Sequence, residues 1–210
     1  MFLLSRLSSL VRLSPSQWKR PLPEALTDAL NVQLANKVMH NVGLVLSVYD
    51  LLCVGDSYLL PMDWEGASHT RVTFRVIVFR PFVEEIAVGK IKSCTREGVL
   101  VSLGFFDDIL IKPEALQHPK RFDETEQVWV WEYPTDEGHH DMFMDPGEEI
   151  RFRVTSEVFV DTSPTAPEAA PKEPPTSGSN ADLAEVKRIP YLLHASVNEP
   201  GLGLISWWNS

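Results

Sequence analysis

The chain of 210 residues is long enough for one large domain or two small ones, and its 44% hydrophobic and 23% charged residues are typical of a globular protein. Its apolar runs are far shorter than the ~20 residues of a membrane-spanning helix, and two cysteines, Cys53 and Cys94, exclude a disulfide scaffold and a zinc finger. Residues 1–80 carry eight Lys/Arg against six Asp/Glu, whereas residues 81–210 carry 11 against 23, which excludes binding of a polyanion through bulk charge.

The first twenty residues allow two interpretations. They contain four Lys/Arg and, before residue 15, four serines, whereas the first acidic residue is Glu24. This composition is typical of a mitochondrial transit peptide. The alternative is a first β-strand over residues 1–7 that is followed by a turn at Ser14-Pro15. Composition alone leaves both interpretations open.

A helix and three strands are predicted next. Leucine recurs at every fourth position, at Leu22, Leu26, Leu30 and Leu34. This spacing predicts an amphipathic helix over residues 23–38. Strands are predicted over residues 42–50, 57–60 and 70–79, the last from its alternation of side chains. Because Pro81 cannot continue a paired strand, we place a domain boundary there. The first domain, residues 1–81, is expected to be a small α+β unit of order β-α-β-β-β.

The second domain, residues 82–210, is expected to be almost wholly β. Predicted strands cover residues 85–93, 99–103, 105–111, 127–133 and 148–159, with a helical turn at 113–116 after the third. Gly89, Gly98 and Gly104 lie where a tightly coiled barrel needs bends and bulges. Five short strands with a helical turn after the third are typical of the OB-fold, a small barrel that often binds oligonucleotides.

A proline-rich segment interrupts this second domain. Residues 161–179 contain five prolines among Ser, Thr, Ala and Glu, and they offer too little apolar surface to offset the entropy of ordering. We expect residues 161–188 to be a disordered insertion. Since apolar sequence resumes at Ile189, the barrel is expected to be completed after the insertion.

No group of residues predicts an active site or a metal centre. His139 and His140 are adjacent, with no third ligand at a recognisable spacing. The carboxylate pairs 107–108 and 148–149 are neighbours in strands, so their side chains face opposite sides and cannot share a proton. Gly201-Leu-Gly203 lacks the lysine and the helix of a phosphate-binding loop. We therefore predict no catalytic residue, no metal and no cofactor.

Aromatic residues are the first candidates for binding. Trp129, Trp131 and Tyr133 are expected on one face of a strand, and Trp207 and Trp208 stand near the end of the chain. Such rows stack on single-stranded bases or form the centre of protein interfaces. The flanking acidic residues, Glu124, Glu126 and Glu132, would repel phosphates. This favours packing or a protein interface, and we predict that the five aromatic residues contact a partner subunit.

Three basic residues are the candidates for contact with RNA. Lys90 and Lys92 are expected on one face of the first barrel strand, and Arg96 follows at its turn. This spacing allows contact with phosphates, although a solvated face of the barrel is the simpler interpretation. We predict Lys90, Lys92 and Arg96 as RNA-binding residues.

Several long strings of residues identify a family. They are residues 34–44, 66–70, 89–92, 98–111, 126–133, 147–154, 159–165 and 199–208. These strings resemble the larger stalk subunit of eukaryotic RNA polymerase III. The resemblance starts at Met1, which favours the strand interpretation of the first residues, and it omits only the proline-rich stretch. The strings Phe159-Val-Asp-Thr-Ser-Pro-Thr165 and Trp207-Trp208 favour polymerase III over the related stalk subunits of other polymerases, which remain an alternative.

The resemblance implies an N-terminal RNP-like α+β domain and a C-terminal OB-fold. It implies a non-catalytic subunit that forms a heterodimer with a smaller, helical stalk subunit and protrudes from the polymerase III core. The implied place of action is the nucleus, in the initiation of transfer RNA, 5S ribosomal RNA and other short transcripts. Initiation factors and nascent RNA are the further implied partners, and no membrane partner is expected. The first strand departs from the family, which usually has acidic residues there, because residues 5–10 contain none.

The second candidate function is a stand-alone OB-fold protein that binds single-stranded RNA. A free RNA-binding protein is expected to be basic on its binding face. Residues 82–160 hold eight Lys/Arg against 17 Asp/Glu, and this balance favours the polymerase subunit.

Overall fold

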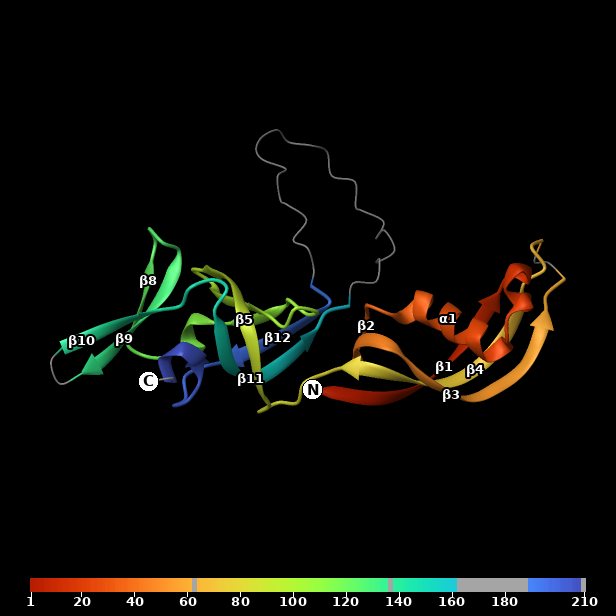
Figure 1. Cartoon of the computed structure of the whole chain (residues 1–210), viewed down its shortest axis with the longest axis horizontal. Helices are drawn as coiled ribbons and strands as arrows, with labels where there is room; N and C mark the ends of the chain where they lie inside the picture. The colour runs from red at the N-terminus through yellow and green to blue at the C-terminus, as the bar shows by residue number, and fades with distance from the viewer. Residues whose placement is uncertain (62–63, 136–137, 162–188, 209–210) are drawn as a thin grey trace, which may run out of the picture. The chain divides into compact units, whose positions relative to one another are not determined.

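The computed structural model describes residues 1–61, 64–135, 138–161 and 189–208 (Figure 1). It is mostly β with one α-helix, and it divides into two compact units, Met1–Glu85 and Ile86–Ser210. The predicted disordered insertion, residues 161–188, lies outside the described residues except for Asp161. No helix within the described residues is long and apolar enough to span a bilayer.

The first unit is a four-stranded antiparallel sheet with one α-helix. Its strands are β1 (Phe2–Leu13), β2 (Lys37–Met39), β3 (Gly43–Leu59) and β4 (Ser68–Phe79), in the order β1-β4-β3-β2. A short 3-10 helix, η1 (Pro15–Lys19), and α1 (Leu22–Leu34) follow β1. The first strand pairs with β4 over its whole length. The strand interpretation of the N-terminal residues is therefore confirmed, and the strand is longer than predicted.

Two predictions in this unit are wrong in their boundaries. The helix ends at Leu34, four residues before the predicted end, because Asn36 adopts a left-handed conformation with φ of 58° and residues 37–39 pair as β2. The predicted strands 42–50 and 57–60 are one strand, β3. Four register shifts between β3 and β4 absorb the residues that interrupt the alternation of side chains.

Helix α1 covers one face of the sheet (Figure 1). Ala25, Leu26 and Leu30 are its buried residues, which confirms the apolar stripe predicted from the leucine spacing. They pack against alternate residues of the strands, among them Val72, Phe74, Val76 and Val78 of β4 and Val11 and Leu13 of β1. The opposite face of the sheet carries no helix among the described residues, and this leaves it open.

The second unit contains a closed barrel of five strands. They are β5 (Ile86–Thr95), β6 (Gly98–Ser102), β7 (Ile109–Ile111), β11 (Glu149–Phe159) and β12 (Tyr191–Ser196). The ring closes because β12 pairs in parallel with β7 and antiparallel with β11. A helical turn, η2 (Pro113–Ala115), follows the third barrel strand, as predicted. Completion of the barrel beyond the insertion is also confirmed, since β12 is its last strand.

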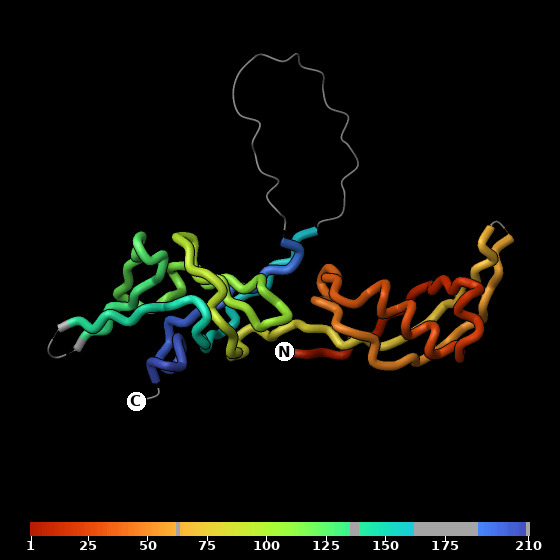
Figure 2. The backbone as a smooth tube through the Cα atoms, turned by 45° about the horizontal axis from the view of Figure 1, so that its top comes forward, coloured from red at the N-terminus to blue at the C-terminus, as the bar shows by residue number. Residues whose placement is uncertain are grey.

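The strand predicted over residues 127–133 does not belong to this barrel. It is β9 (Val128–Thr135), the centre of a separate sheet with β8 (Lys120–Asp123) and β10 (Gly138–Phe143). This sheet extends away from the barrel strands in both views (Figures 1 and 2). The prediction failed because alternation of side chains identifies a strand but not its neighbours. The last elements among the described residues are β13 (Gly203–Leu204) and a 3-10 helix, η3 (Ile205–Trp208).

Candidate binding surfaces

Exposed and buried residues alternate along most of β5, and Lys90 and Lys92 lie on its exposed face. The Nζ atom of Lys92 lies 2.8 Å from Oδ2 of Asp107, whose Oδ1 accepts a hydrogen bond from the Ser102 hydroxyl at 2.5 Å. The hydrogen bond with Asp107 raises the pKa of Lys92. The bonds from Lys92 and Ser102 lower the pKa of Asp107. The charge of Lys92 is therefore balanced within the unit.

Arg96 and Lys90 differ in whether a carboxylate pairs with their charge. Arg96 forms an ion pair with Glu124, and both side chains are largely exposed. Lys90 has no ion-pair partner among the described residues, and Glu149 is its neighbour across the β5–β11 pairing. Lys90 lines a cavity of about 340 Å³ beside Gly104. The three predicted RNA-binding residues are thus near one another in the chain, but only Lys90 is unpaired.

Trp129 is held inside the unit. Its ring is only 8% exposed, and its Nε1 donates a hydrogen bond to the carbonyl oxygen of Thr95 at 2.9 Å. The ring of Phe122 lies 5.2 Å away, centroid to centroid. This tryptophan joins β9 to the end of β5, and its indole is not available on the surface.

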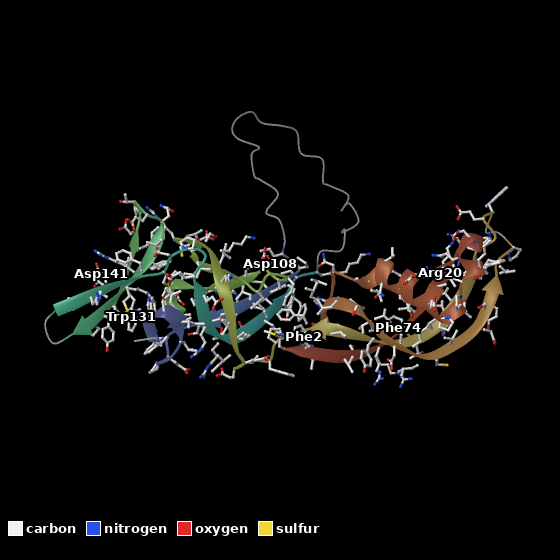
Figure 3. The ribbon with its side chains drawn as sticks, in the orientation of Figure 1. Phe2, Arg20, Phe74, Asp108, Trp131 and Asp141 are labelled. Carbon is white, nitrogen blue, oxygen red and sulfur yellow. The ribbon has the colours of Figure 1, made fainter. Side chains whose placement is uncertain are left out.

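The other four aromatic residues of the prediction form one group, which we call the aromatic cluster: Trp131, Tyr133, Trp207 and Trp208. Figure 3 labels Trp131. The centroid of its ring lies 5.1 Å from that of Tyr133, in an edge-on arrangement, and 5.2 Å from that of Trp207. Tyr133 and Trp208 are 43% and 44% exposed. Together with Trp131 they line a cavity of about 340 Å³. The fold therefore brings residues 131–133 and 207–208 to one surface.

A glycine makes this packing possible. Gly203 has φ of +103°, and a Cβ atom at that position would lie 2.7 Å from the Trp207 ring. Only glycine combines this backbone conformation with such a close approach. Trp208 is fixed by the hydrogen bond that its Nε1 donates to the Leu202 carbonyl oxygen at 3.2 Å. The Nε1 of Trp131 is buried and has no hydrogen-bond partner among the described residues.

The acidic and histidine motifs lie on the surface. Asp141 forms an ion pair with Arg121, and its neighbours His139 and His140 are exposed. In the part of the chain that the structure describes, no three His, Cys, Asp or Glu residues are grouped so that they would hold a metal ion. Asp107 serves as the partner of Lys92, as described above.

Sequence reasoning missed an exposed surface in the first unit. Phe2, Leu4 and Leu10 of β1 are each about half exposed, and Arg6 lies between them. The alternation of β1 was the available signal. It was obscured because both faces of this strand carry apolar residues.

Comparison with known proteins assigns the family. The model for "RNA polymerase III subunit Rpc25" matches residues 85–208, and the model for the "SHS2 domain found in N terminus of Rpb7p/Rpc25p/MJ0397" matches residues 8–63. The chain is 55% identical to DNA-directed RNA polymerase III subunit RPC8 of Bos taurus over 210 residues, which is 100% of both chains. It is 42% identical to subunit rpc8 of Schizosaccharomyces pombe, over 99% of this chain and 100% of the relative.

A relative from another polymerase is more distant. DNA-directed RNA polymerase II subunit RPB7 of Saccharomyces cerevisiae is 29% identical over 106 residues, covering 50% of this chain and 61% of that protein. The full-length matches to the polymerase III subunit are thus longer and higher in identity, and they agree with the resemblance of the residue strings. The chain belongs to the family of RNA polymerase III subunit Rpc25.

Proposed function

We propose that the chain is a non-catalytic stalk subunit of RNA polymerase III and acts in the nucleus in the initiation of transfer RNA, 5S ribosomal RNA and other short transcripts. The observation that carries the proposal is the 55% identity with the bovine polymerase III subunit over the full length of both chains. Within this proposal, residues 1–81 are an RNP-like domain and residues 82–210 are an OB-fold domain. The role is positional, since the subunit presents surfaces to initiation factors and to the transcript.

The aromatic cluster is the proposed contact with the smaller, helical stalk subunit. Tryptophan and tyrosine contribute much of the binding energy in protein interfaces, because they bury a large area at a small cost in conformational entropy. Tyr133 and Trp208 are nearly half exposed around an open cavity, which leaves apolar area for a partner to cover. Trp129, which is only 8% exposed, is not part of this proposed contact.

Lys90, Lys92 and Arg96 are the proposed contact with nascent RNA. Two of the three cations are already paired with carboxylates, so phosphates would have to compete with Asp107 and Glu124. The contact is therefore weak and independent of sequence. A weak contact suits a surface along which a transcript moves, because tight binding would retain the RNA.

Purification of the tagged full-length chain from its source cells tests the assignment. We expect the wild-type chain to recover a small helical partner and the polymerase III core. We expect the Trp208→Ala variant to recover less of the small partner. Trp18→Ala is the matched control, since Trp18 is 51% exposed in the first unit. Recovery of the chain alone, or with RNA only, would overturn the proposal in favour of a stand-alone RNA-binding protein.

Crosslinking of the assembled enzyme to its transcript tests the RNA contact. Replacing Lys90, Lys92 and Arg96 with Glu is expected to reduce crosslinking to this subunit. The matched control reverses three cations of the first unit, Lys19, Arg20 and Lys37. Equal crosslinking by the triple variant and the wild-type enzyme would remove these residues from the proposal.

A further inference from the structure

We propose that the free edge of β1, with the open sheet face beside it, is a docking site for an extended segment of another protein in which apolar and acidic side chains alternate. The inference concerns the first unit alone and does not depend on the function proposed for the barrel and the aromatic cluster.

The first observation is the unprotected edge of β1. Within the described residues β1 pairs only with β4, in an unbroken register from Phe2 to Leu13. About half of its backbone N–H and C=O groups therefore point away from the sheet. Proteins commonly protect such an edge with proline, with charged side chains, especially lysine, or with a bulge. Residues 2–13 contain no proline and no lysine, their charged residues are Arg6 and Arg12, and the pairing with β4 has no bulge.

The second observation is the apolar character of the open face. Phe2, Leu4 and Leu10 are 51%, 51% and 54% exposed. They alternate with residues on the other face of β1, where Val11 and Leu13 belong to the core under α1. Figure 3 shows the position of Phe2 on this strand. A partner strand beside β1 would cover these side chains, and burial of apolar area contributes roughly 25 cal/mol per Å².

The third observation is unbalanced positive charge on the same face. Arg6 and Arg71 are exposed and have no ion-pair partner among the described residues. Other cations there are balanced: Arg75 Nε lies 2.8 Å from Asp50 Oδ1, and Arg12 lies 2.6 Å from Glu65 Oε2. A partner that brings carboxylates to Arg6 and Arg71 would supply the missing negative charge.

A cavity lies next to Arg71. Its volume is about 490 Å³, and its lining includes Leu10, Asp56, Tyr58 and Arg71. Leu10 lies directly across from Arg71 in the β1–β4 register. The cavity therefore offers an apolar contact beside Arg71. Because Asp56 lies in the same lining, the cavity suits an apolar side chain of the segment better than a carboxylate.

Charge also selects the occupant. A second copy of the chain would bring the β1 arginines near those of the first copy, since β1 contains no acidic residue. Like charges in adjacent strands are destabilising. RNA would satisfy the cations, but it would leave the backbone groups of the edge and the apolar side chains uncovered. A peptide strand satisfies the backbone groups, the apolar residues and the cations together.

Hydrogen exchange of the full chain tests the proposal. The probe is an acetylated nine-residue peptide of alternating Val and Glu, and the control is the same peptide with Lys in place of Glu. We expect the Val–Glu peptide to slow amide exchange within residues 2–13 at least tenfold. The Val–Lys peptide is expected to have no effect. No protection, or equal protection by both peptides, would overturn the proposal.

A double variant adds a second measurement. Arg6→Glu with Arg71→Glu is expected to weaken binding of the Val–Glu peptide about tenfold, whereas the matched variant Lys19→Glu with Lys37→Glu, at two other exposed positions of the first unit, keeps it. If the first variant misfolds, as judged by circular dichroism, the comparison of the two peptides on the wild-type chain decides. Protection by an oligouridine instead of the peptide, or protection that grows with protein concentration alone, would assign the edge to RNA or to a second copy and overturn the proposal.

Discussion

Gly98 allows a direct test of how closely the barrel strands pack. This residue begins β6 and has φ of +141°. A Cβ atom at this position would lie 2.2 Å from the carbonyl oxygen of Ile111 on the neighbouring strand β7. Separations below 3.0 Å are essentially absent for real Cβ atoms. In Gly98→Ala, one of the two strands must therefore move.

The expected cost has two parts. A non-glycine residue held in this backbone region costs about 1–3 kcal/mol, and displacement of packed neighbours costs about 1–3 kcal/mol more. Gly104→Ala is the matched control, because Gly104 also has a positive φ, +87°, but no atom lies within 4 Å of its Cβ position. We expect Gly98→Ala to be less stable than Gly104→Ala by the packing cost alone, about 1–3 kcal/mol.

Urea unfolding of the full chain, followed by tryptophan fluorescence, measures this difference. Trp129 is bonded to Thr95, three residues before Gly98, so its emission reports on this hairpin. Equal unfolding free energies for the two variants would refute the argument, because the carbonyl of Ile111 would then impose no constraint on Gly98.

Three further predictions concern side chains that differ in burial. In α1, Leu30→Ala is expected to lower the free energy of unfolding by about 2–5 kcal/mol, because Leu30 is fully buried. Val32 is 85% exposed, so the unfolding free energy of Val32→Ala, measured by thermal melting, is expected to stay within about 0.5 kcal/mol of wild type. Iodoacetamide is expected to alkylate exposed Cys53 before buried Cys94, since burial raises the pKa of the Cys94 thiol; equal rates in the folded chain, measured by mass spectrometry, would contradict this. Burial also lowers the pKa of His194. As the pH falls, the unfolded chain is therefore protonated at this histidine before the folded chain, and the unfolding free energy should decrease below a pH of about 6.5. Denaturant titrations at several pH values should show a smaller decrease for His194→Gln. The same pH profile for the variant and the wild type would refute this prediction.

Local sequence patterns predicted most of the helices and strands, but they did not predict which strands pair with one another. The leucine spacing located α1 because one face of that helix meets the sheet. The helix end was missed because the four-residue apolar spacing continues from Leu34 to Val38, although asparagine, as at Asn36, favours the left-handed conformation that stops the helix. The strand containing Trp129 was predicted correctly as a strand but assigned to the wrong sheet. Pairing between strands depends on contacts distant in sequence, which periodicity does not contain.

The candidate surfaces show the same limit. The sequence identified Lys92 and Arg96 as cations, but it gave no sign of their partners, Asp107 and Glu124, which lie 15 and 28 residues away in the chain. The aromatic cluster was predicted only as two separate groups of residues. The fold joins them because Gly203 lets the Trp207 ring approach the backbone.

Where an acidic ligand can bind therefore depends more on which cations are already paired with carboxylates than on the net charge of each half of the chain. Residues 81–210 carry a large excess of acid, yet that acid includes the specific partners of Lys92 and Arg96, so much of the predicted RNA surface is neutral. Residues 1–80 hold nearly equal numbers of Lys/Arg and Asp/Glu, but within the described part of the chain Arg6 and Arg71 have no ion-pair partner beside the open strand edge. An acidic ligand would replace water at these two arginines, whereas at Lys92 and Arg96 it would have to displace a carboxylate. The first unit is consequently the better place for an acidic partner, and its slight excess of Lys/Arg over Asp/Glu agrees with this.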